Sequence, residues 1–238
     1  MIEEKDYVPS FLERIELYTI PDQRYVSLCF EAMKQICTSL DTICDYKKNN
    51  YEVDGDVFLV YERNYVIALA VELAKRHERL DTTGLKEVIS GEVVKSLSLA
   101  YSSVRELYVR IRKELDKHYK GKKKDIFVLP DFLIHESHSY QDGKLDEEHQ
   151  HLAMEVKTRE IKRKELFQLD FLKLNYYLDS LNFANVIYVL VGTPVKTIDD
   201  YIESYYNEIK YKSAKASKQL YFFIQEKFKS EPVIYKLK

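Results

Sequence analysis

The sequence reads PDFLIH at residues 130–135 and MEVK at residues 154–157, and these two stretches decide the fold. Apolar and polar residues alternate in both with a period of two, which is typical of half-buried β-strands. Side chains two residues apart on a strand point to the same face. Asp131 is therefore predicted on one face of the first strand, while Glu155 and Lys157 share a face of the second.

A turn signal separates the two predicted strands. Asp142-Gly143 is the strongest short-range turn signal in the chain, and such a pair favours a β-hairpin. Position 143 is also midway between residues 131 and 155. A hairpin without a bulge would set Asp131 opposite Glu155, with Cβ atoms about 4.5–5.5 Å apart. Two carboxylates in that arrangement repel each other unless a cation lies between them.

Carboxylates beside a lysine suit chemistry on phosphates. Mg²⁺ takes hard oxygen ligands, uses one or two carboxylates and keeps several waters that a substrate phosphate can replace. Lys157 lies two residues beyond Glu155, about 7 Å along the strand. There it could orient or deprotonate an attacking water, or neutralise charge on the phosphate. The sequence thus predicts a metal site at Asp131 and Glu155, with Lys157 as a catalytic neighbour.

The same residues carry a family resemblance. Pro130-Asp131 followed by Glu155-Val156-Lys157 resembles the signature of the PD-(D/E)XK (restriction-endonuclease-like) nuclease superfamily. The resemblance implies an α/β fold with a mixed sheet and an αβββαβ core. It further implies an endonuclease that uses Mg²⁺ or Mn²⁺ to hydrolyse phosphodiester bonds in nucleic acid, with DNA favoured. The alternative is a catalytically inactive nuclease-fold protein that binds nucleic acid or a protein partner.

The resemblance suggests further site residues. Members of the superfamily often add a glutamate from the first helix, and Glu62 is our first choice because it ends an apolar run and opens a predicted helix. Glu72 and Glu106 are the alternatives, and a helix-terminus charge is an equally good explanation of Glu62. Accessory candidates are His135, on the predicted Asp131 face, and the pair formed by Asp170 and Lys173, which could also be a plain surface ion pair.

The chain beyond Lys157 is expected to complete the core. Residues 158–181 are predicted as a helix, and the apolar run at residues 185–191 predicts a strand covered on both faces. A strand, a helix and a strand form a right-handed βαβ unit, so residues 185–191 should run parallel to residues 152–157.

The other elements are predicted from periodicity alone. We expect a helical N-terminal extension over residues 1–55 and a nuclease-like domain over residues 56–238, as one compact unit. Helices are predicted at residues 24–46, 62–78, 85–99, 102–117 and 197–212. Residues 220–224 fit either a strand or a buried helix.

Local basic segments are the candidates for contact with nucleic acid. Lys122, Lys123 and Lys124 form the densest run, just before the Asp131 strand, and each neutralised phosphate would add salt-sensitive affinity. A solvated turn is the competing interpretation. Two weaker candidates are residues 162–164 and the set Lys210, Lys212, Lys215 and Lys218. Four histidines in and near the hairpin could suit zinc, but their spacing matches no standard zinc pattern; they are His135, His138, His149 and His151.

The composition bounds the class of protein. The 238 residues are 45% hydrophobic and 32% charged with a formal net charge of −2, which argues against a disordered or wholly polybasic chain. Three cysteines without paired spacing fit reduced thiols. No signal peptide or membrane-spanning run is recognisable. We therefore expect a cytoplasmic protein without a membrane partner, and we leave a homodimer open.

Overall fold

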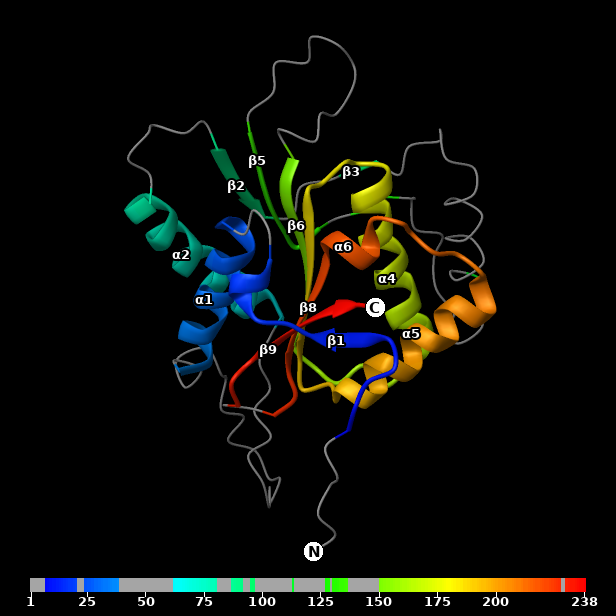
Figure 1. Ribbon diagram of the computed structural model, residues 1–238. Coiled ribbons are helices and arrows are strands. Elements are labelled where there is room, and N and C mark those ends of the chain that lie inside the picture. Colours follow the sequence, from blue (N-terminus) through cyan, green and yellow to red (C-terminus); the bar gives the residue numbers. More distant parts are fainter. Residues whose placement is uncertain are drawn as a thin grey trace, which may run out of the picture.

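The fold is α/β, built on an open mixed sheet with helices on both faces (Figure 1). The computed structural model describes residues 7–20, 24–38, 62–80, 87–91, 95–96, 113, 127–128, 130–136, 150–227 and 230–238. Within these residues, seven strands form one sheet in the order β1-β9-β8-β7-β6-β5-β2, and β3 pairs with β4 separately.

The strands follow the chain in this order: β1 (Leu12–Arg14), β2 (Glu87–Gly91), β3 (Lys95–Ser96), β4 (Phe127–Val128), β5 (Phe132–Glu136), β6 (Gln150–Lys157), β7 (Asn185–Val191), β8 (Leu220–Gln225) and β9 (Val233–Leu237). The helices are α1 (Arg24–Thr38), α2 (Glu62–Leu80), α4 (Lys164–Asp179), α5 (Val195–Ile209) and the single turn α6 (Ala216–Gln219), with a 3₁₀ turn at Leu17–Thr19.

The β5–β6 pair has the predicted register over most of its length. The strands are antiparallel, and Phe132 lies opposite Met154. Residues 132 and 154 are equally far from position 143. The same register, continued by one residue, would set Asp131 opposite Glu155. The register shifts between Ile134 and His135, so the expectation of a bulge-free hairpin was wrong beyond that point. The predicted turn at Asp142-Gly143 lies outside the described residues.

The centre of the sheet is buried on both faces, as predicted for residues 185–191. Strand β7 runs parallel to β6 and to β8. Alternate residues of these strands join two apolar layers: α4, α5 and α6 cover one face, and α1 and α2 cover the other. Leu133 and Ala153 belong to the α4 layer, while Phe132 and Met154 belong to the α1–α2 layer. The predicted alternation of faces is thus confirmed.

Some predicted elements were wrong because long-range contacts override local periodicity. Residues 87–91, predicted within a helix, form β2 because they pair with β5. The helix predicted from residue 158 begins only at Lys164. The Ile161 backbone N–H donates to Thr193 Oγ1 and the Ile161 carbonyl accepts from Tyr201 OH, so side chains hold this loop out of a helix.

The edge of the sheet that carries β1 is formed by the C-terminal strands β8 and β9 and by β1 itself. Residues 220–224 lie in β8, which is a strand and not a helix. Strand β8 pairs with β9, and β9 pairs with β1, two short strands that periodicity did not reveal. The 1–55/56–238 boundary, the end of the 24–46 helix and nearly all of the 102–117 helix lie outside the described residues.

Strand β1, near the N-terminus, pairs with β9, the last strand of the described chain. Leu12 pairs with Leu237, and the Lys238 backbone N–H donates to the Phe11 carbonyl at 3.0 Å. Asp199 in α5 accepts the backbone N–H groups of Ser10 and Phe11, each at 2.7 Å. In the part of the chain that the structure describes, no helix has the length and apolar character needed to cross a membrane.

Candidate active site

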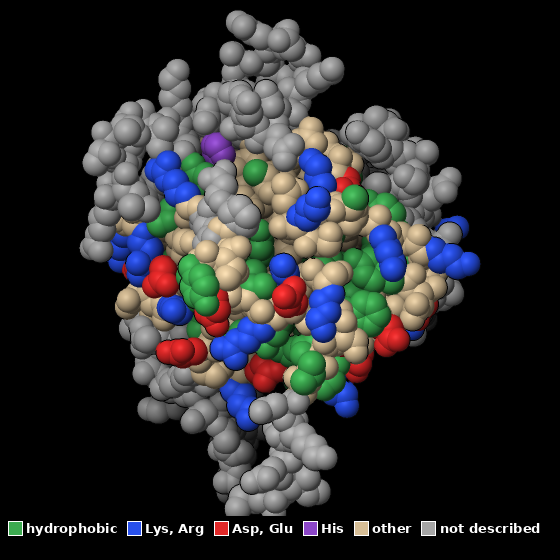
Figure 2. Space-filling model, in the orientation of Figure 1, with side chains coloured by type: hydrophobic (Ala, Val, Ile, Leu, Met, Phe, Trp, Pro, Cys, Tyr) green, Lys and Arg blue, Asp and Glu red, His purple; other side chains and the backbone are tan. Residues whose placement is uncertain are grey.

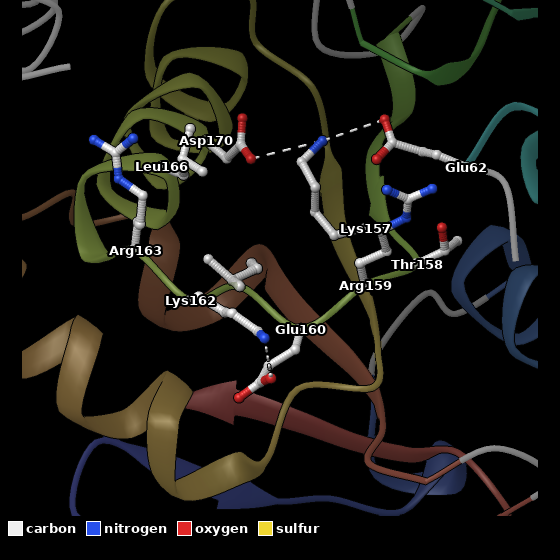
Figure 3. Close-up of a pocket in the computed structure, with 10 residues that line it drawn as sticks. Glu62, Lys157, Thr158, Arg159, Glu160, Lys162, Arg163, Leu166 and Asp170 are labelled. Atoms are coloured by element: carbon white, nitrogen blue, oxygen red, sulfur yellow. Dashed lines mark hydrogen bonds and ion pairs between the residues drawn. The ribbon is translucent and has the colours of Figure 1, made fainter. Parts of the chain in front are cut away.

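Acidic and basic side chains meet where β6 ends. Strand β6 contributes two of them, the segment before β5 contributes one, the N-terminus of α2 contributes one and α4 contributes two. We call the group the charge cluster, and its members are Glu62, Asp131, Glu155, Lys157, Asp170 and Lys173. Figure 3 shows the Lys157 ammonium between the carboxylates of Glu62 and Asp170.

Asp131 is positioned by the end of the β5–β6 ladder. Ladder pairing starts at Phe132, so the half-buried Asp131 precedes it. Its Oδ2 accepts the Val156 backbone N–H at 2.7 Å, and its Oδ1 accepts no hydrogen bond from the residues that the structure describes. Burial raises the pKa of Asp131, although the ammonium of Lys157 opposes that shift. The carboxylate thus keeps one oxygen for a further positive partner.

Glu155 is the most deeply buried carboxylate of the charge cluster, with its side chain 1% exposed. Its Oε1 accepts the Tyr177 hydroxyl at 2.6 Å, and its Oε2 lies 3.0 Å from Lys173 Nζ. Burial raises the pKa of Glu155 to about 7, with Asp131 adding to the shift and Lys173 opposing it. A second cation close to Glu155 would favour its ionised form.

The two lysines are held differently. Lys173 Nζ lies 2.9 Å from Asp170 Oδ1 and 3.0 Å from Glu155 Oε2, so it bridges two carboxylates. Lys157 Nζ is farther from its partners, at 3.6 Å from Asp170, 3.5 Å from Glu62 and 4.0 Å from Glu155. Its shortest contact is 3.1 Å to the Val156 carbonyl. Lys157 is therefore the more loosely held ammonium.

Both lysines stay charged at neutral pH. Burial lowers the pKa of Lys157, but the carboxylates of Asp170 and Glu155 outweigh it, and the pKa of Lys157 lies above its ordinary value. The same balance raises the pKa of Lys173. A lysine with a raised pKa is a poor general base. Of the roles predicted for Lys157, the structure favours donating hydrogen bonds and stabilising negative charge over taking a proton.

Asp170 forms ion pairs with both lysines of the charge cluster. Burial raises its pKa, but the two ammonium groups outweigh that, so the pKa of Asp170 lies below its ordinary value. Its Oδ2 also accepts the Tyr188 hydroxyl at 3.1 Å. Asp170 is therefore an ionised carboxylate on α4 that pairs with two ammonium groups. The sequence suggested either an accessory site residue or a plain surface ion pair.

The first prediction concerns the pH dependence of stability. A carboxyl whose pKa is higher in the folded chain contributes stability below its unfolded pKa, and that contribution is lost as the pH rises through the folded value. For Glu155 the window runs from 4.5 to about 7. In EDTA, the free energy of unfolding should fall across this window in the wild type and fall less in Glu155→Gln. Urea unfolding at several pH values measures the difference, and parallel pH profiles would contradict the prediction.

Of the three candidate helix glutamates, the structure brings Glu62 to the cluster. Glu62 opens α2, and its Oε1 is 3.5 Å from Lys157 Nζ. Glu72 lies ten residues further along α2, about 15 Å at the usual helical rise, and pairs with Lys75 at 2.7 Å. Glu106 lies outside the described residues.

His135 does not join the cluster. It lies four residues beyond Asp131, about 13 Å along the strand, past the register shift and opposite Gln150. The strand carries it toward the other end of the ladder, and its role as an accessory residue that reaches the phosphate or a metal-bound water stays a prediction. His151 stacks on Tyr25 with ring centroids 4.8 Å apart. His138, His149 and the basic run Lys122, Lys123 and Lys124 lie outside the described residues.

Sequence reasoning missed Tyr177 and Tyr188, which donate to Glu155 and Asp170. A signal for Tyr177 existed, since Asp170, Lys173 and Tyr177 are three and four residues apart and so share one face of a helix. It also missed a groove of about 820 Å³ beside the cluster. The groove is lined by Glu62, Lys157, Thr158, Arg159, Glu160, Ile161, Lys162, Arg163, Leu166 and Asp170.

The donor types fit a hard divalent cation. Within the described residues, no group of three or more His, Cys, Asp or Glu side chains is gathered closely enough to hold a metal ion. A cation at Asp131 and Glu155 would therefore take its other ligands from water or substrate, which is how Mg²⁺ is commonly bound.

Comparison with known proteins adds no relative. No family model matches the sequence, and searches of curated proteins and of solved structures find no similar chain.

Proposed function

We propose that the protein is a nuclease of the PD-(D/E)XK type that uses Mg²⁺ or Mn²⁺ to hydrolyse phosphodiester bonds in nucleic acid, with DNA as the favoured substrate. The observation that carries the proposal is the charge of the cluster. Its four carboxylates face two ammonium groups at the end of β6. With all six ionised, the cluster carries two more negative than positive charges, and the burial of Glu155 and Asp170 makes that excess costly. One divalent cation would supply the missing charge.

The order of elements supports the proposal. Helix α2, strands β2, β5 and β6, helix α4 and strand β7 follow one another around the cluster, apart from the β3–β4 excursion. The first two strand pairs are antiparallel and the last is parallel. A helix, three strands, a helix and a fourth strand is the core that the resemblance implies.

Five residues of the cluster have a role in this mechanism. Asp131 and Glu155 would hold the metal, whose contribution is Lewis-acid stabilisation of charge on the phosphate. In the reaction, a water oxygen bonds to phosphorus while the water releases a proton to solvent, the bond to the leaving oxygen breaks, and the leaving oxygen takes a proton from solvent. The Lys157 ammonium can donate a hydrogen bond to the attacked phosphate. Glu62 and Asp170 flank Lys157 and orient it.

The groove offers a path for the phosphate backbone. Arg159, Lys162 and Arg163 line it within seven residues of Lys157. Figure 2, by contrast, shows Lys and Arg scattered among acidic and apolar side chains over the described part of the face that carries β1. The second prediction follows. Replacing these three groove residues with Ala should flatten the slope of log K against log salt for duplex binding by up to about 0.9 for each lost phosphate contact.

A matched control uses three exposed basic residues that do not line the groove, Arg14, Lys196 and Lys227. Their replacement with Ala changes the net charge equally, and the slope should stay near that of the wild type. Equal slopes in the two triple variants would remove the groove from the binding surface. A third variant, with Ala at Lys122, Lys123 and Lys124, measures the share of the basic run.

One observation favours the alternative of an inactive binding protein. Both oxygens of Glu155 already have partners, Tyr177 and Lys173. The discriminating experiment is incubation of supercoiled plasmid and of labelled single strands with the protein in Mg²⁺, Mn²⁺ or EDTA. Metal-dependent nicking is expected. Binding without cleavage in every metal would favour the alternative.

A further inference from the structure

Lys173 lies between two carboxylates of the charge cluster. Its ammonium is within 3.0 Å of both Glu155 and Asp170, and its side chain is only 17% exposed. It arises from the middle of α4, most of whose residues are buried, so its backbone is fixed. Two carboxylates that share one cation at hydrogen-bond distance resemble half of a two-metal site, in which ions about 3.5–4 Å apart share ligands.

Glu155 has acidic neighbours at two positions. At the first is Asp131, whose charge acts on Glu155 and whose Oδ1 accepts no hydrogen bond from a described residue. At the second are Lys173 and Asp170. The second position is therefore filled by the protein itself, whereas the first has an available oxygen.

We propose that Lys173 is a built-in cation in place of a second metal, so that the centre binds one divalent ion, between Asp131 and Glu155. This inference rests on the proposed function. The charges agree with it, since Asp170 and Lys173 neutralise each other. Within the charge cluster, Lys157 then remains to balance Glu62, Asp131 and Glu155, which leaves the two negative charges that one divalent ion balances.

The test counts bound ions without relying on activity. Mn²⁺ is titrated into the protein, and free Mn²⁺ is measured by electron paramagnetic resonance. One ion per chain is expected for the wild type. Lys173→Met exposes Glu155 and Asp170 to each other without a cation and should bind two. The double variant Lys173→Met/Asp170→Asn removes both members of the pair and should bind one again.

The control is Lys164→Met, at a lysine that pairs with Glu208 at 2.6 Å and does not line the groove; it should bind one ion. Thermal unfolding checks that each variant is folded. If Lys173→Met does not fold, Lys173→Gln takes its place, since it keeps a donor and lacks the charge, and it should also bind two ions.

Two ions in the wild type, or one ion of unchanged affinity in the Lys173 variant, would overturn the inference while the proposed function stands. No ion in the wild type would instead refute the proposed function. If the wild type binds no ion, one ion bound by the Lys173 variant would still support the role of Lys173 as a built-in cation. No ion in the variant either would overturn that role as well.

Discussion

Asp131→Asn is expected to abolish both divalent-metal binding and cleavage while the protein stays folded. The amide oxygen can still accept the Val156 backbone N–H that Asp131 accepts at 2.7 Å. The change removes the negative charge and the oxygen available to a cation. The remaining carboxylate, Glu155, already has partners at both oxygens, Tyr177 and Lys173, so it should not retain Mg²⁺ without Asp131. Cleavage should fall to the level measured in EDTA.

The measurement is Mn²⁺ binding together with nicking of plasmid DNA at matched protein concentration. Glu203→Gln is the matched control, because Glu203 is an exposed carboxylate on α5 outside the charge cluster. It should bind metal and cut DNA like the wild type. Cleavage that survives in Asp131→Asn would mean that the reaction takes place elsewhere in the chain.

Lys157→Met is expected to lower the rate of cleavage by about two to four orders of magnitude, the usual range for loss of a positioned donor or stabilising charge. Metal binding should persist, because the variant keeps both carboxylates and removes a repelling cation. The stability should change little. The Lys157 side chain is 25% exposed, and its ion pairs of 3.5–4.0 Å are long.

Single-turnover cleavage and Mn²⁺ titration on the same preparation separate this result from that of Asp131→Asn. The two variants should differ in metal binding and agree in losing activity. A Lys157→Met protein that cuts DNA at the wild-type rate would remove Lys157 from the reaction and would leave it a role in charge balance only.

The hairpin could be predicted because its information is local. The alternation around Asp131 and Glu155 shows which side chains share a face, and Phe132 lies opposite Met154 in the predicted register. The strand at residues 185–191 is equally local, since its apolar run records burial on both faces. Glu62 lies 3.5 Å from Lys157 because it starts its helix near the end of β6, and its role in the site stays a prediction.

The rest of the site depends on how α4 packs, which periodicity does not encode. Helical spacing groups Asp170, Lys173 and Tyr177, but it does not say that this face lies against Glu155 rather than solvent. The groove depends on residues 158–163 leaving the helical path, and a contact with Thr193, about thirty residues later, decides that. Strand β2 was misassigned for the same kind of reason.

The pairing of β1 with β9 has a consequence for the time course of synthesis. Leu12 and its partner Leu237 are 225 positions apart, and ribosomes add about 5–20 residues per second. The first strand therefore waits roughly 11–45 s for its partner. Throughout that interval its backbone N–H and C=O groups are exposed to other nascent chains, and an unpaired strand edge is prone to aggregation. Its brevity, three residues with two exposed side chains, limits that hazard.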